Sequence, residues 1–356
     1  MNKTSTSQAS IAKHLGVSQA LVSMVLNGRE EGISPATFKR IWEYAVASGY
    51  TPKGMKVSLA KTEQPKATGV GYFLRAPFRL ATKTNFFSHV SQGLHDYVSE
   101  CGLNLIFLGS EADDLSKMKK RLGVVRRTLK GVVVLGEVGS EFQSFVRDLN
   151  LPTVIVSSRA TGVFHSINSN ELKAADMLAE HLYELGHRKF CFIGGTAPMG
   201  RYLERKEAVM SSLARLGVKD ADSHFVRIDG GADRTEGQQA AQQVLDEFSS
   251  KTIPTAWIVS NGSMARGVCT RLLHEGLVIG KDVSIAAIDM TRVCWDEEPS
   301  LTSAAAVPEE MGFEAGRLVV ESEIGASDTF RDIVLPANIE VRESTGKPSK
   351  ARLLSS

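Results

Sequence analysis

A stretch of twenty residues near the start of the chain, Gln8 to Asn27, constrains the fold more than any other. It reads QASIAKHLGVSQALVSMVLN, and Ile11, Ala12 and Leu15 fall on one face of a helix before a glycine that permits a sharp turn. Ser18 is a capping residue type and begins a second helical pattern. The apolar face of that pattern consists of Leu21, Val22, Val25 and Leu26. The stretch therefore predicts a helix-turn-helix.

Two helices this short are not stable alone, so a third helix is expected to cover them. Ser34-Pro35 supplies a cap residue followed by a proline at the first turn. Apolar residues then recur at helical spacing until Gly49, and they are Phe38, Ile41, Trp42 and Ala45.

The second helix of a helix-turn-helix enters the major groove of DNA by its N-terminal end. Gln19 suits bidentate bonding to adenine and Ala20 suits contact with a thymine methyl, whereas Met24 cannot make the guanine contact of an arginine. The alternative is a purely structural three-helix element that binds no nucleic acid. The expected DNA-binding residues of this region are Ser7, Ser18, Gln19, Ala20, Ser23, Met24 and Asn27.

The charge is divided unevenly along the chain, although its net value is only +2. Residues 1–66 contain nine Lys and Arg against four Asp and Glu, while the remainder contains 33 against 36. A basic segment with a mildly acidic body is what phosphate binding by the N-terminal part requires. The whole length of 356 residues exceeds one ordinary core, so two or three domains are expected.

The N-terminal region resembles the headpiece of the LacI/GalR transcription regulators. The resemblance rests on Gly-Val-Ser at 16–18, on Val22-Ser23, on Val25-Leu26-Asn27 and on Gly49-Tyr50-x-Pro52. Three positions depart from the family pattern, because Ser10, Leu21 and Met24 stand where Asp, Thr and Arg are usual. The family's contacts at 21 and 24 therefore do not carry over. The resemblance implies a helix-turn-helix headpiece over residues 1–50.

Residues 51–67 are rich in Lys and are broken by Pro52, Gly54 and Pro65, which is typical of a linker. The resembling family has a hinge helix here that forms on DNA and wedges a Leu into the minor groove, and Leu59 occupies that position. Lys53 and Lys56 are expected to contact phosphates. A plain flexible linker remains the alternative, because Gly54 disfavours a helix.

From residue 68 to residue 345 short apolar runs alternate with amphipathic stretches, which predicts parallel sheets covered by helices on both faces. Seven runs predict strands, at 69–74, 103–109, 131–136, 153–158, 189–195, 256–260 and 282–289. The phrases LAEHLYELGHRKFCFIGG, SNGSMARG, DVSIAAID and PSLTSAAAVPEEMG resemble, in order, the effector-binding core of the same family. That resemblance implies an α/β two-lobed, periplasmic-binding-protein-like domain with parallel sheets.

The chain crosses between the two lobes three times in that fold. We expect lobe 1 at about 68–164 and 293–328, and lobe 2 at about 165–292 and 329–345. The tail at 346–356 has no heptads, so a tetramerising coiled coil is not expected.

Ligands of open α/β sheets bind beyond the carboxyl ends of the strands, so residues that follow strands are the candidates. For each candidate residue the alternative to ligand binding is a structural role, as a core aromatic, a surface charge or a turn residue. Gly262 replaces a usual Asp and Ala306 a usual Gln, which indicates an altered pocket. The expected effector-binding residues are Arg75, Phe86, Phe87, Arg205, Asn261 and Asp289.

Enzymatic chemistry is not supported by any motif. GGTAPMGRY (194–202) approaches a phosphate-binding loop, but Arg201 and Tyr202 stand where Lys and a hydroxyl that binds Mg²⁺ are needed. The four cysteines form no C-x-x-C pair, which favours reduced thiols, and neither a metal nor a cofactor is expected. We also expect no membrane span and no secretory signal, because the chain has no long apolar run.

Together these features predict a cytoplasmic, homodimeric repressor that binds double-stranded DNA at a pseudo-palindromic operator. Its control by a small-molecule effector, with sugars as the first candidates, is implied by the resemblance. The alternative is a solute-binding or sensor protein without a DNA role, which the basic headpiece opposes.

Overall fold

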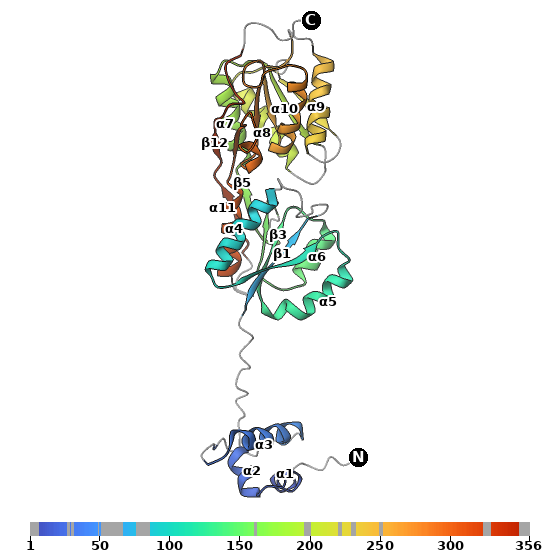
Figure 1. Cartoon of the computed structure of the whole chain (residues 1–356), viewed down its shortest axis with the longest axis vertical. Coiled ribbons are helices and arrows are strands. Elements are labelled where there is room, and N and C mark those ends of the chain that lie inside the picture. Colours follow the sequence, from blue (N-terminus) through green and yellow to red (C-terminus); the bar gives the residue numbers. More distant parts are fainter. Residues whose placement is uncertain are drawn as a thin grey trace. The chain divides into compact units, whose positions relative to one another are not determined.

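The computed structural model separates the chain into two compact units, Met1–Gln64 and Pro65–Ser356 (Figure 1). Each unit is described by itself. The structure describes residues 7–26, 29, 32–48, 50, 67–75, 86–159, 162–195, 201–219, 223–228, 233–248, 252–322 and 329–348.

The first unit contains the predicted helix-turn-helix and its covering helix, as α1 (Gln8–Leu15), α2 (Gln19–Leu26) and α3 (Pro35–Ala47). The bend between α1 and α2 is 115°, and Gly16 adopts φ 67° between them. The hydroxyls of Ser18 and Ser34 accept hydrogen bonds from amides three residues ahead, both at 3.2 Å. The buried core of the unit consists of Ile11, Ala12, Val22, Val25, Leu26, Ile41 and Ala45.

Trp42 belongs to the apolar pattern of α3, but it is 38% exposed. It stacks on Phe38 with ring centroids 6.1 Å apart. Phe38 is partly buried against the core, so Trp42 extends the apolar surface outward from it.

The second unit contains two six-stranded sheets. The first sheet has the order β11-β5-β4-β3-β1-β2, and all its pairings are parallel. One face packs on α4 (Phe86–Glu100) and α11 (Pro308–Glu321), and the other on α5 (Leu115–Val125) and α6 (Ser140–Arg147). The strands are β1 (Gly69–Leu74), β2 (Asn104–Ser110), β3 (Leu129–Leu135), β4 (Thr153–Val156), β5 (His165–Ser169) and β11 (Asp332–Leu335).

Alternation along the strands explains why both faces are covered. In β3, Val133 and Leu135 pack toward α4 and α11, whereas Val132 and Val134 pack toward α5 and α6. A parallel strand that is buried on both faces has a continuous run of apolar residues, and that run is what predicts the strand from the sequence.

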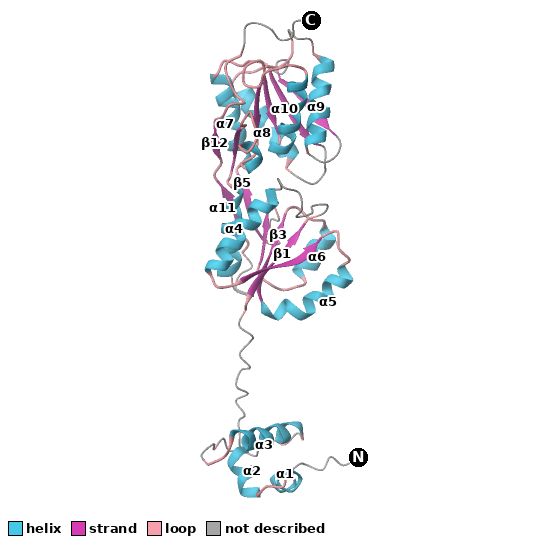
Figure 2. Cartoon of the chain, viewed as in Figure 1, coloured by secondary structure: helices cyan, strands magenta, loops and turns pink. Residues whose placement is uncertain are grey.

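The second sheet has the order β12-β10-β9-β8-β6-β7, with β12 antiparallel to β10. Helices α7 (Glu171–Glu184) and α8 (Tyr202–Arg215) cover one face, and α9 (Arg234–Glu247) and α10 (Gly262–His274) cover the other (Figure 2). The strands are β6 (Phe190–Gly195), β7 (Ser223–Ile228), β8 (Ala256–Val259), β9 (Ser284–Ala287), β10 (Thr302–Ala305) and β12 (Asn338–Glu340).

The expected lobe boundaries at 165, 293 and 329 are too early. Strand β5 pairs with β4 in the first sheet, β10 pairs with β9 in the second, and β11 returns to the first beside β5. The chain therefore crosses between β5 and β6, between β10 and β11, and between β11 and β12. The boundaries are too early because each expected crossing falls before a strand, β5, β10 or β11, that still belongs to the preceding lobe. Strand β5 is polar, so no apolar run in the sequence indicated that it is a strand.

Helices α4 and α11 pack closely although they lie far apart in the sequence. A Cβ on Gly93 would lie 1.8 Å from the carbonyl oxygen of Glu309, and one on Gly312 would lie 1.9 Å from that of Val90. The two glycines therefore allow the helix backbones to touch. His89 of α4 also hydrogen-bonds through Nδ1 to Glu309 of α11 at 2.6 Å.

All four cysteines are free, and Cys101 alone among them is exposed. In the described ranges no single helix is long and apolar enough to cross a membrane, and only the bent pair of α1 and α2 passes that test jointly. No group of three or more His, Cys, Asp or Glu side chains among the same residues is placed to hold a metal ion.

Candidate nucleic-acid interface and interlobe cleft

The first turn of α2 presents an uncharged, exposed surface. Ser18, Gln19 and Ala20 are exposed, and Met24 is 37% exposed, while Ser23 is half-buried. The opposite face holds the buried core of the unit. The structure therefore gathers the predicted base-reading residues on one face, as a major-groove helix requires.

Charge around these helices favours phosphates. None of the three helices has an acidic residue in its first turn, so no carboxylate within those turns neutralises the partial positive charge of the helix N-termini. Arg40 donates from Nη2 to the carbonyl oxygen of Leu15 at 3.0 Å, and His14 stacks on Tyr44 at 4.4 Å. These contacts hold the end of α1 against α3.

Ser7 lies at the N-terminus of α1, where it forms a capping box with Ser10. The Ser7 hydroxyl accepts from the Ser10 amide at 3.2 Å, and the Ser10 hydroxyl accepts from the Ser7 amide at 2.9 Å. Ser10 thus takes the capping partner's place at the position where the resembling family has Asp. Asn27, Lys53, Lys56 and Leu59 lie outside the described residues.

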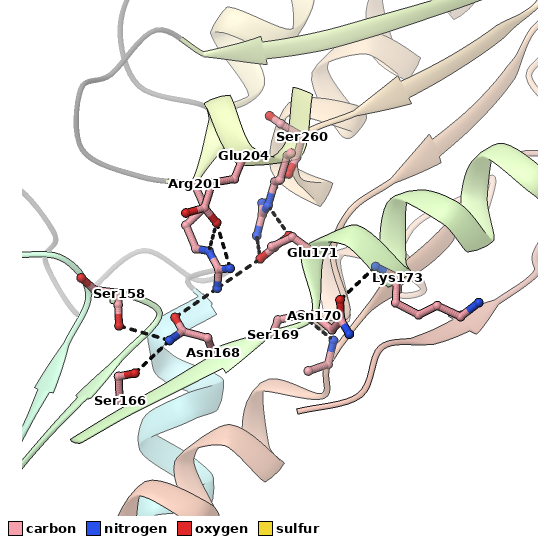
Figure 3. A network of polar contacts seen from close by, with 12 residues as sticks. Ser158, Ser166, Asn168, Ser169, Asn170, Glu171, Lys173, Arg201, Glu204 and Ser260 are labelled. Carbon is pink, nitrogen blue, oxygen red and sulfur yellow. Dashed lines mark hydrogen bonds and ion pairs between the residues drawn. The ribbon is translucent and has the colours of Figure 1, made fainter. Parts of the chain in front are cut away.

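The second unit contains a buried network of two arginines and a glutamate (Figure 3). Glu171, the first residue of α7, has a side chain only 5% exposed. Arg205 donates to it twice, from Nε to Oε2 at 2.8 Å and from Nη2 to Oε1 at 3.1 Å. Arg205 also donates to the carbonyl oxygen of Ser260, at the end of β8. Burial lowers the pKa of Arg205, but the charge and hydrogen bonds of Glu171 outweigh burial and leave that pKa raised.

Arg201 links this pair to the first sheet. Its Nη1 lies 3.7 Å from Oε1 of Glu171 and donates to Oδ1 of Asn168, on β5, at 3.1 Å. Its Nε and Nη2 donate to Glu204 at 3.1 and 3.0 Å. Asn168 in turn donates to the carbonyl oxygen of Ser158 at 3.3 Å. The network therefore runs without a break from one sheet to the helices of the other.

Asn261 and Asp289 both bind the start of α10. Asn261 caps the helix by accepting from the amide of Met264 at 2.9 Å. The carboxylate of Asp289 accepts from the amides of Gly262 at 2.8 Å and Thr291 at 2.6 Å. These bonds fix the positions of both side chains and give each of them a structural task.

Gly262 has little room for a side chain. A Cβ at this position would lie 2.5 Å from Cγ1 of Val293, 3.0 Å from Sγ of Cys294 and 3.2 Å from Oδ2 of Asp289. The aspartate that the resembling family carries here would therefore displace its neighbours. The close packing around this position accounts for the glycine, and the altered pocket stays a prediction.

Arg75, Phe86 and Phe87 lie together at the end of β1 and the start of α4. A Cβ on Gly136 would lie 2.3 Å from Cδ of Arg75 and 2.9 Å from Cζ of Phe87, so this glycine lets both side chains approach β3. Phe87 is 5% exposed within the core, and Phe86 packs against it edge-on at 5.2 Å. For Phe87 the geometry favours the core role over ligand stacking.

A cavity of about 360 Å³ adjoins the network. It opens at the end of β5, at the start of α7 and beside the first turns of α8. None of the six expected effector residues lines it. The lining consists of Arg159, Ser169, Asn170, Glu171, Leu172, Arg201, Glu204, Glu207, Ala208, Ser211 and Val334.

The sequence prediction missed Asn168, Glu171 and Arg201. Glu171 obeys the same rule as the residues that were found, because it directly follows the N-cap after a strand of a parallel sheet. That strand is β5, HSINS, which has no apolar run. If β5 had been recognised as a strand, Glu171 would have been predicted to line the cleft.

Comparisons with known proteins agree with this architecture. Residues 179–345 match the family model described as a periplasmic binding protein-like domain. The chain is 26% identical over 339 residues to catabolite control protein A of Priestia megaterium, covering 94% of this chain and 98% of that protein. It is 25% identical over 349 residues to the transcriptional repressor CytR of Escherichia coli K12, covering 96% and 97%.

Two solved structures share the fold over nearly the whole chain. The complex of the regulator CelR with cellobiose matches with a TM-score of 0.66 and 21% identity, over 95% of this chain and 99% of that one. The Lac repressor bound to ONPG matches with a TM-score of 0.65 and 20% identity, over 96% and 100%.

Proposed function

The chain belongs to the LacI/GalR family of transcription regulators, and we propose that it is a cytoplasmic, homodimeric repressor whose operator affinity is set by a small-molecule effector. The observation that carries the proposal is that one chain holds both the helix-turn-helix with its exposed α2 turn and the two-sheet unit with its buried polar network. The relatives are regulators and not enzymes.

Base reading falls to the first turn of α2. Gln19 offers a donor and an acceptor to adenine, and Ala20 offers a methyl to thymine. One headpiece reads only a half-site, so two copies related by a two-fold axis would read a pseudo-palindromic operator. Lys53, Lys56 and Leu59 of the hinge would add phosphate contacts and a minor-groove wedge.

The effector is proposed to be a sugar or a related metabolite. Related solved regulators hold cellobiose, ribose and sucrose, which supports this class of ligand. Arg75, Phe86, Arg205, Asn261 and Asp289 are the proposed lining of the effector site. Arg205 connects this site to the adjoining cavity, because it is bonded both to Glu171, which lines the cavity, and to the carbonyl of Ser260, which precedes Asn261. A ligand controls DNA binding only if it prefers one arrangement of the lobes, because differential affinity is what shifts the equilibrium.

Selected-site sequencing with the full-length protein tests the DNA role. We expect a pseudo-palindromic consensus, and exchange of Gln19 and Ala20 should change the preferred base pairs at about one or two positions in each half-site. Lys173→Ala, in the second unit, serves as the matched control and should keep the wild-type consensus. Absence of any consensus for the wild type would instead favour a solute-binding protein without a DNA role.

A further inference from the structure

The buried carboxylate of Glu171 accepts hydrogen bonds that the Arg205 guanidinium could otherwise donate to a bound anion. Guanidinium groups bind carboxylates and phosphates through paired hydrogen bonds, and Arg205 already makes such a pair with Glu171. Its remaining Nη1 donates to the carbonyl of Ser260. Arg201 lies against the same carboxylate and is also bonded by Glu204.

We propose that Glu171 is the specificity residue of the interlobe cleft, and that its pairing with Arg201 and Arg205 makes the cleft reject carboxylates and phosphates and accept uncharged, hydroxylated ligands. This inference rests on the proposed effector function, because it names the chemical class that the effector site takes. Glu171 acts on anions through the arginines that it holds, so it is a positioning residue, and it also lines the adjoining cavity.

The charges around the adjoining cavity point the same way. Two arginines, Arg159 and Arg201, line it together with three carboxylates, those of Glu171, Glu204 and Glu207. With Arg205 paired to Glu171 the charges balance at three of each sign, so the cavity offers an incoming anion no net attraction. To reach Arg205 an anion would also have to displace Glu171 and leave that carboxylate buried without a partner, which is strongly unfavourable.

Uncharged ligands do not face this barrier. A hydroxyl can donate to a carboxylate or accept from a guanidinium without breaking the ion pair. Ser169 and Ser211 add hydroxyls to the same wall. The cleft therefore offers hydrogen-bonding groups to a polyol, while the positive charges of its arginines stay neutralised by the carboxylates.

Glu171→Gln removes the charge and preserves the shape, so it tests the proposal. Thermal unfolding of the full chain is followed while inorganic phosphate, and separately glucuronate, is titrated at constant ionic strength. We expect both anions to stabilise the variant saturably, and we expect no saturable stabilisation of the wild type up to an anion concentration about tenfold above the variant's midpoint. Glu184→Gln, at the exposed end of the same helix, is the matched control and should behave as the wild type.

Equal responses of the wild type and Glu171→Gln, whether both bind the anions or neither does, would overturn the proposal. If Glu171→Gln does not fold, the wild type still decides: saturable stabilisation by phosphate or glucuronate overturns the proposal, and a response to neutral sugars alone supports it. Operator binding of the wild type is measured in parallel by fluorescence anisotropy. Its loss would reject the proposed DNA role without deciding the role of Glu171, which the anion titration decides separately.

Discussion

Replacement of Arg205 by methionine should destabilise the second unit strongly. The Arg205 side chain is 17% exposed and that of Glu171 is 5% exposed, so the change leaves a buried carboxylate without its paired donors. Breaking a buried ion pair costs about 3–5 kcal/mol. Because Arg201 still lies 3.7 Å from Glu171, we expect a loss near the lower end, about 3–4 kcal/mol.

Urea unfolding followed by circular dichroism measures this loss, and calorimetry should show a melting temperature lower by about 5–10 °C. The double variant Glu171→Leu/Arg205→Met should recover most of the stability, because neither charge is then buried alone. Arg292→Met is the control, since its pair with Asp296 is exposed at 67% and 47% and should matter by less than about 1 kcal/mol. An Arg205→Met variant as stable as this control would refute the reasoning.

Three further changes are expected to have distinct effects. Leu59→Ala should weaken specific operator binding by a few kcal/mol or less and reduce DNA bending in a circular-permutation gel assay; unchanged bending would reject the wedge. Burial lowers the pKa of His187 below 6.5, so the unfolded state binds more protons than the folded state. The urea midpoint should therefore fall as the pH drops below about 6.5, with no such loss above it. His187→Gln should flatten this pH dependence. Gly262→Asp should lower stability by about 1–3 kcal/mol in the same assay, because its Cβ would lie 2.5 Å from Val293, and an equally stable variant would contradict the steric argument.

Local signals explain why the first unit could be predicted closely. The caps at Ser18 and Ser34 and the apolar spacing of α1 and α2 depend on residues only a few positions apart. Six of the seven apolar runs became strands because parallel strands within a sheet are buried on both faces. The seventh, β2, is an edge strand in which Phe107 is 46% exposed.

Strand β5 shows what the sequence could not reveal. Its residues Ser166, Asn168 and Ser169 are buried although they are polar. Burial is tolerated because partners elsewhere in the chain satisfy them, as Asp332 does for Ser166 and Asn168. Such pairings span more than 160 positions, so no local pattern contains them.

The candidate cleft illustrates the same limit. Asn261 and Asp289 could be placed because each lies at or just after the end of a predicted strand, whereas Arg205 lies within α8. The partner of Arg205 could not, because Glu171 lies 34 residues away and nothing in the sequence couples the two. Phe87 was assigned to the ligand because its aromatic type fits both a core and a binding site.

The late return of the chain to both sheets has a consequence for biosynthesis. Helix α11 and strand β11, which complete the first sheet and its cover, leave the ribosome only after nearly the whole second sheet has been made. Strand β12 of the second sheet emerges later still. Until then the apolar side of α4 that will meet α11 has no partner, and the nascent protein exposes it to chaperones and to other chains. A ribosome that stalls or a message that ends before residue 308 would therefore release a product in which neither lobe is complete.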